Sequence, residues 1–355
     1  MIIETLRGEG AMLRDTPWGP VALDFGDWEA EYRAFRQSVG VFRPPAATQV
    51  EISGNDRAAF LNRLATNRLD RIQPGEGCET FLADANGRIL FHVFVFGGPE
   101  SLVLDTAAGL GPGLCAHLDH YWIREDLKFH DRSSQWGQLV LAGPQSNDVV
   151  ERIAGSPLPS SRLREAGEGS YLSAFNVSWN GRPLMVRRFQ DRGFLSFYLA
   201  GEAADMAVLW QALRQSGAVA CGMRALETIR IEEGFPVVGQ DITEKNLPQE
   251  VGRNEKAISF TKGCYLGQEI VARIDSRGAV GKVLCGLRLR TADVPPGGSE
   301  LTHDGQPAGQ VTSAAYSPGF GTCAALAYIR RGFCEPGTVL DSACGPATVV
   351  ELPMR

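Results

Sequence analysis

The feature that most constrains this chain is one segment, residues 261–269, which reads Thr-Lys-Gly-Cys-Tyr-Leu-Gly-Gln-Glu. The apolar residues 257–260 before it predict a short strand, and the residues from Gly267 onward favour a helix. Cys264 is therefore expected in a turn close to a helix N-terminus, with Lys262 two residues away. Because a positive helix end and a nearby ammonium both favour thiolate over thiol, Cys264 is a candidate functional thiolate and Lys262 its partner. The alternative is that Cys264 is a small buried apolar residue.

Length and charge limit the classes of protein that this chain can belong to. A chain of 355 residues is expected to hold two or three domains, and an apolar fraction of 44% is ordinary for a globular protein. A net charge of −6 argues against broad, charge-driven binding of nucleic acid. The sequence contains no apolar run of membrane-spanning length, and its first residues lack a signal pattern. We expect a cytoplasmic monomer with no membrane partner and no direct nucleic-acid partner.

The eight cysteines are scattered, and no two of them form a Cys-x-x-Cys pair. In a reducing compartment they are expected to be thiols, and their spacing predicts no metal site within one local segment. His117 and His120 fall on one helical face, where a solvated helix surface is the simpler interpretation.

Residues 262–269 resemble the signature of the YgfZ family of folate-binding proteins, which are tied to iron–sulfur cluster maintenance. That family is related to the aminomethyltransferase, or T-protein, of the glycine cleavage system. A weaker similarity to this superfamily (GcvT-like) runs from Val39 to Ile329 and includes the Gly-x-Pro helix exit at 234–236. The resemblance implies an α+β fold with a folate-binding core at residues 1–278 and a small C-terminal β-barrel at 279–355.

The resemblance also implies a site for tetrahydrofolate. Asp191 aligns with a glutamate that holds the pterin ring in relatives, although it could merely shape a turn. Arg230 lies where relatives place an arginine near the folate, and the alternative is an i,i+3 pairing with Glu227 or Glu233. Gln268 and Glu269, at the end of the signature, complete the residues that the resemblance assigns to the cofactor.

One departure from the superfamily concerns the hairpin predicted around the turn at Asn86-Gly87. Aminomethyltransferases carry an Asp-Asp pair on the following strand, and the matching positions here are Phe91 and His92. A phenyl ring cannot transfer a proton, and His92 is read either as an ordinary strand histidine or as a different acid. This departure argues against glycine-cleavage chemistry.

The resemblance therefore implies a tetrahydrofolate-binding protein that supports assembly or repair of iron–sulfur clusters in client enzymes, including enzymes of tRNA modification. Its expected partners are folate and iron–sulfur client or assembly proteins. Two alternatives stay open: a folate-dependent one-carbon transferase, and a non-catalytic scaffold without folate. Whether the protein is an enzyme is not decided by the sequence.

Overall fold

The computed structural model describes residues 2–158, 171–191, 194–278 and 280–355. The chain forms two compact units. The first unit comprises residues 1–63, 67–80 and 93–226, and the second comprises 64–66, 81–92 and 227–355. None of the helices in the described residues is long and apolar enough to span a membrane.

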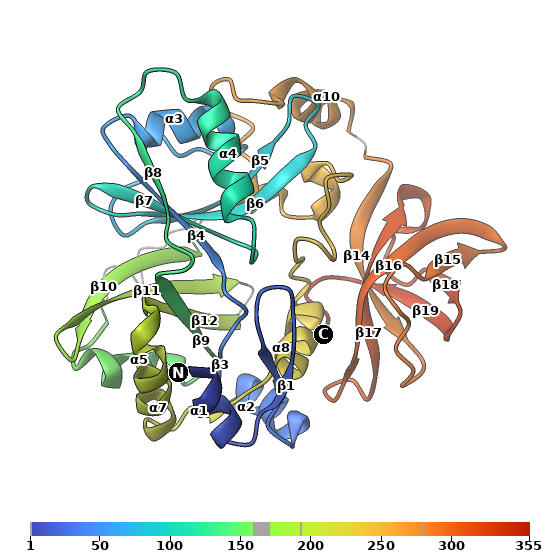
Figure 1. Cartoon of the computed structure of the whole chain (residues 1–355). Helices are drawn as coiled ribbons and strands as arrows, with labels where there is room; N and C mark the ends of the chain where they lie inside the picture. The colour runs from blue at the N-terminus through green and yellow to red at the C-terminus, as the bar shows by residue number, and fades with distance from the viewer. Residues whose placement is uncertain (1, 159–170, 192–193, 279) are drawn as a thin grey trace. The chain divides into compact units, whose positions relative to one another are not determined.

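The first unit is built on two sheets (Figure 1). The six-stranded sheet has the order β10-β11-β12-β9-β3-β13, and its strands are Leu172–Trp179, Arg182–Asp191, Phe194–Glu202, Trp136–Ala142, Gly40–Phe42 and Val219–Ala220. The other sheet has the order β5-β6-β7-β4-β8, with strands Gly77–Ala83, Ile89–Gly97, Ser101–Thr106, Thr48–Ser53 and Lys128–Asp131. Strands β5 and β6 continue into the second unit at the ends that meet in their hairpin. A small ribbon of β1 (Met12–Arg14) and β2 (Val21–Asp24) precedes both sheets.

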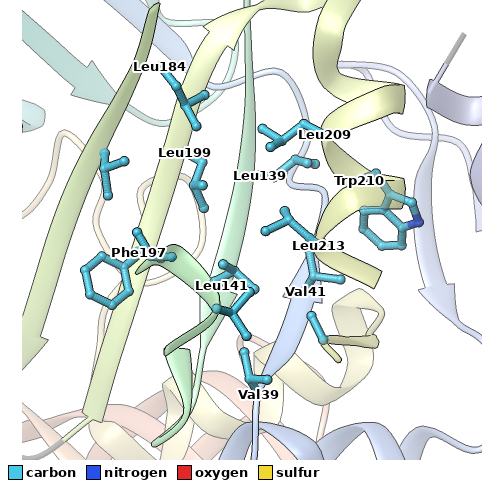
Figure 2. Close-up of a cluster of buried hydrophobic side chains, with 14 of the residues drawn as sticks. Val39, Val41, Leu139, Leu141, Leu184, Phe197, Leu199, Leu209, Trp210 and Leu213 are labelled. Atoms are coloured by element: carbon cyan, nitrogen blue, oxygen red, sulfur yellow. The ribbon is translucent and has the colours of Figure 1, made fainter. Parts of the chain in front are cut away.

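Helices cover the six-stranded sheet because each has one apolar face. In α7 (Met206–Gln215) the buried side chains are Met206, Leu209, Trp210 and Leu213, which follow the i, i+3, i+4, i+7 spacing of a single helical stripe. Figure 2 shows this stripe facing the buried side chains of strands β3, β9 and β12. Burying each large apolar side chain contributes roughly 1.5–3 kcal/mol, so this cluster is a main source of the unit's stability. The other α-helices that begin in the described part of this unit are α1 (Ile2–Gly8), α2 (Trp28–Gln37), α3 (Arg57–Leu64), α4 (Gly111–Tyr121), α5 (Ser146–Ala154) and α8 (Met223–Glu233).

The second unit contains the closed barrel that the sequence predicts (Figure 1, orange to red). Its strand order is β14-β17-β16-β15-β18-β19, with strands Lys282–Leu289, Thr322–Arg330, Gln306–Ser317, Glu300–His303, Val339–Ser342 and Gly345–Val350. Closure leaves these strands without a free sheet edge. Short helices precede the barrel, namely α9 (Asn254–Ala257) and α10 (Gln268–Arg277).

The predicted strand at 257–260 is wrong. Ala257 ends helix α9, and the next residues run without a strand partner along their length. A backbone hydrogen bond of 3.0 Å, from the Ser259 N–H to the Thr66 carbonyl, ties this stretch to a segment remote in sequence. The apolar character of Ile258 serves a buried cluster with Phe81 and Val271 rather than a sheet.

Candidate functional site

Lys262 is buried, and its ammonium is turned toward the protein rather than toward solvent. The Nζ atom donates a hydrogen bond of 2.8 Å to the carbonyl oxygen of Ala65 and lies 5.1 Å from the centre of the Tyr265 ring. An ammonium in this position fixes the loop to the segment around Ala65, because burying the charge without such partners is costly. Lys262 therefore has an anchoring role in the loop.

Cys264 is exposed, whereas its neighbours Lys262 and Tyr265 are buried. The expected helix does follow it: α10 begins at Gln268, and Gly267 is its N-cap with φ of 79°. A Cβ atom on Gly267 would lie 2.5 Å from the Asp84 carbonyl oxygen, so only glycine fits where the loop meets the hairpin turn. This close packing holds the Cys264 thiol at the surface of the unit on a rigid loop.

Gln268 and Glu269 make local contacts. The Gln268 Oε1 atom accepts a hydrogen bond of 3.4 Å from the Tyr265 N–H, within the same loop. Glu269 pairs with Arg273 one turn along α10, at 2.9 Å between exposed side chains. Gln268 thus shares one loop with Lys262 and Cys264, and Glu269 points along the helix surface.

Arg230 lies in a buried network of its own. A guanidinium has five N–H donors, and all five are used: two on Glu227, one on Asp241, one on the Ser313 hydroxyl and one on the Phe235 carbonyl. Asp241 is fully buried and also accepts from the Thr312 and Ser313 hydroxyls. The acidic partners raise the pKa of Arg230 against the opposing effect of burial, which is the largest single influence. A folate contact by Arg230 would require one of these five bonds to open.

Asp191 ends strand β11 in the first unit, opposite Phe194 of β12. Because side chains alternate along a strand, Asp191 shares a face with Phe189 two residues earlier. The Phe189 ring lies 5.3 Å from the ring of Phe94 and 4.5 Å from that of Tyr198, measured between centroids. These three rings are only half-buried. A half-exposed aromatic surface beside a carboxylate fits a pterin, which offers a flat ring and an amino-pyrimidinone edge.

The aromatic surface and a neighbouring buried network were not identified from the sequence. Arg187, on the same face of β11, is fully buried and donates to Asp105 at 2.5 Å and to the Gln49 Oε1 atom at 2.7 Å. Gln138 adds a hydrogen bond of 2.9 Å to Asp105. The only local signal is that Arg187 directly follows the apolar residues 184–186, and this does not reveal a partner 82 residues away.

His92 occupies a buried position on β6 within the second unit. Its ring lies 5.0 Å from the Phe81 ring and 6.3 Å from the Phe235 ring, between centroids. Phe91 beside it is also buried. The two positions that correspond to the aspartate pair of the superfamily therefore lie in buried, aromatic surroundings here, and His92 is the one of the two with a titratable side chain.

Comparisons with known proteins cover nearly the whole chain. Residues 8–262 match the GCVT N-terminal domain, and residues 282–354 match the glycine cleavage T-protein C-terminal barrel domain. The chain is 29% identical to an aminomethyltransferase of Frankia alni over 96% of this chain and 95% of that protein. It is 26% identical to an aminomethyltransferase of Bacillus subtilis over 93% of this chain and 94% of that protein. The crystal structure of glycine cleavage system aminomethyltransferase T from Bartonella henselae matches with a TM-score of 0.85 at 19% identity, covering 99% of this chain and 96% of that one, and so confirms the fold.

Proposed function

The chain belongs to the glycine cleavage T-protein (GCVT) family, and on this premise we propose that it binds tetrahydrofolate and transfers a one-carbon unit to or from it. The observation that carries the proposal is the full-length match to relatives named aminomethyltransferase. Tetrahydrofolate is the substrate that this family uses. The resemblance of residues 262–269 to the YgfZ signature favoured an iron–sulfur role, whereas the names of these relatives support the one-carbon transferase better.

The residues of this chain support the proposal at the pterin end. Asp191 would accept hydrogen bonds from the amino-pyrimidinone edge, and Phe94, Phe189 and Tyr198 would pack against the ring. The folate, when bound, supplies the nitrogen atoms that carry the one-carbon unit. For proton transfer, His92 is the candidate on β6, since Phe91 has no titratable group.

Two measurements on the purified protein test the proposal. A calorimetric titration with tetrahydrofolate should show binding, and a second assay should show methylene-tetrahydrofolate formed from an aminomethylated lipoyl carrier above the rate without enzyme. The His92→Gln variant, which cannot exchange a proton at neutral pH, should bind folate but turn over more slowly. Binding without turnover in the wild-type protein would defeat the transferase proposal, and no binding would defeat any folate-dependent function.

A second function is favoured by one observation: the exposed Cys264 thiol on the rigid loop 259–268. This loop carries the YgfZ-type signature, and we propose as the second candidate a folate-dependent role in iron–sulfur cluster assembly or repair. Replacement of the aspartate pair by Phe91 and His92 supports this candidate as well. Restoration of iron–sulfur enzyme activity in cells that lack a YgfZ protein would support it, whereas turnover with the lipoyl carrier would favour the transferase.

A further inference from the structure

A cavity of about 460 Å³ that opens to solvent is lined by residues of the first unit. Its lining combines apolar side chains with charged ones, and it is made by Glu9, Phe25, Asp27, Ala30, Glu31, Arg214, Val219 and Ala220. This volume falls within the range of about 300–1,000 Å³ that small-molecule sites occupy. None of these residues has a part in the folate proposal.

The charges in the cavity do not balance. Glu9 is neutralised by Arg214, with 3.0 Å between the Oε2 and Nε atoms, and its other oxygen accepts from the Trp210 indole at 2.9 Å. Asp27 caps the Ala30 N–H at 2.9 Å, and its one ion pair among the described residues is a 4.0 Å contact with Arg33 between largely exposed side chains. Glu31 is buried, and within the described residues its bonds are to backbone N–H groups, those of Phe25 at 2.6 Å and Gly222 at 2.7 Å. Within the described residues, the two carboxylates of Asp27 and Glu31 thus line the cavity with no cationic partner closer than 4.0 Å.

The Glu31 carboxyl is held under electrostatic strain. Burial raises its pKa most, the two backbone donors oppose this effect, and the neighbouring Asp24 and Asp27 add to it. A positive charge in the cavity would offset the cost of burying the ionised Glu31 and its repulsion by the two aspartates. A carboxylate has about four lone-pair sites, so Glu31 can accept further donors while keeping its two backbone bonds.

The apolar part of the lining also suits a ligand. Val219 is 37% exposed at the cavity, and Phe25 is half-buried with its ring stacked on Trp210 at 6.0 Å between centroids. An aromatic face next to carboxylates attracts organic cations, since the ring quadrupole and the negative charges act together. A metal ion is a poorer fit, because the described residues contain no group of three or more side chains suited to hold one.

We propose that this cavity binds a small organic monocation, an amine attached to an apolar or aromatic body. The ammonium would lie between Asp27 and Glu31, and the body would pack against Phe25, Ala30 and Val219.

The test uses three probes of one shape and different charge: benzylamine, benzyl alcohol and benzoate. In titrations of the full chain followed by NMR, benzylamine should bind at least about fivefold more tightly than the other two, because only it gains the carboxylates. The backbone amides of Phe25 and Gly222, which hold Glu31, should shift on binding. Equal affinity for benzyl alcohol, or shifts confined to other amides, would overturn the proposal.

Variants of the lining test separately the effect of its negative charge and the effect of its free volume. Asp27→Asn keeps the side-chain oxygen that caps the Ala30 N–H at 2.9 Å, and it should weaken benzylamine binding severalfold. Ala30→Leu, a helix-compatible change, should fill the cavity and abolish binding. The matched control is Glu29→Gln, which removes the same charge from the same helix outside the cavity and should leave affinity unchanged. An equal loss in Glu29→Gln and Asp27→Asn, or full binding by a folded Ala30→Leu protein, would contradict the proposed site.

Discussion

The Lys262 ammonium and the Ala65 carbonyl oxygen, which are 197 residues apart in the sequence, are joined by a hydrogen bond of 2.8 Å. The bond is buried, and it ties the loop that carries Cys264 to the segment between α3 and β5. Thr66, the next residue, reinforces the same junction, since its hydroxyl donates to the Ala257 carbonyl at 2.7 Å. The rigidity of the loop therefore depends on contacts remote in sequence.

The first prediction concerns this anchor. Lys262→Met keeps the apolar stem but removes the charged donor, so the free energy of unfolding should fall by about 1.5–3 kcal/mol. Urea unfolding followed by circular dichroism measures the loss. Lys245→Met, a change at an exposed lysine, is the control and should leave the midpoint where it is. Identical curves for wild type and Lys262→Met would mean that the bond contributes nothing to stability.

The second prediction concerns the Arg230 network. Asp241 has a fully buried side chain, whereas that of Glu227 is 31% exposed. Asp241→Ala should cost about 3–5 kcal/mol because it leaves a buried guanidinium without its inner partner. Glu227→Ala should cost only about 1–2 kcal/mol because water can replace the lost oxygens. Thermal unfolding of the two variants would refute this ranking if Glu227→Ala proved the less stable.

Local chemistry explains which features were predictable. The turn at Asn86-Gly87 was predictable because an Asn-Gly pair by itself favours a tight hairpin turn. Gly87 has a φ of 73°, a conformation that glycine adopts without strain. The barrel was also predictable, since short strands and frequent turns repeat along residues 282–350. For Arg230, the i,i+3 partner Glu227 was foreseen as an alternative, but Asp241 and Ser313 come from a loop and a barrel strand.

The candidate site was less predictable because its members meet only through tertiary packing. Phe94 and Phe189 lie on different sheets of the first unit, and the sequence of neither strand indicates that the two rings are in contact. The same holds for residues 257–260, which were predicted as a strand from their apolar character. The Ser259 N–H instead donates to the Thr66 carbonyl, a contact that depends on tertiary packing. Sequence patterns report periodicity along one element, whereas these contacts depend on how separate elements pack.

The third prediction concerns the pterin contact. Asp191→Ala should weaken tetrahydrofolate binding by about 1–3 kcal/mol if the carboxylate holds a charge-assisted hydrogen bond. Glu202→Ala is the control, because it removes an exposed carboxylate at the far end of β12, the strand that pairs with β11. Calorimetry on both variants gives the comparison. If Asp191→Ala bound as tightly as wild type, the pterin would have to contact other residues.

The last prediction concerns Cys264 and begins with its exposure. Burial raises the pKa of Cys285 and of Cys323 to about 12, so near neutral pH these two thiols stay protonated as well as covered. Burial likewise raises the pKa of Cys221, which is enclosed in the first unit. Iodoacetamide at pH 7.5 should therefore modify Cys264 first among the eight cysteines, as peptide mass spectrometry can show. Earlier modification of any of the three buried cysteines would contradict the described packing.

The same thiol decides between the two candidate functions. Cys264→Ser keeps the size of the side chain but replaces the thiol with a hydroxyl, which is a far poorer nucleophile and soft-metal ligand. If the thiol carries the iron–sulfur role, this variant should fold and bind tetrahydrofolate normally yet fail to restore iron–sulfur enzyme activity in cells. Cys334→Ser, at a partly exposed cysteine of the barrel unit, is the matched control and should restore it. Full restoration by Cys264→Ser would show that the thiol has no role in that function. The one-carbon transferase, which the family match supports, would then be favoured.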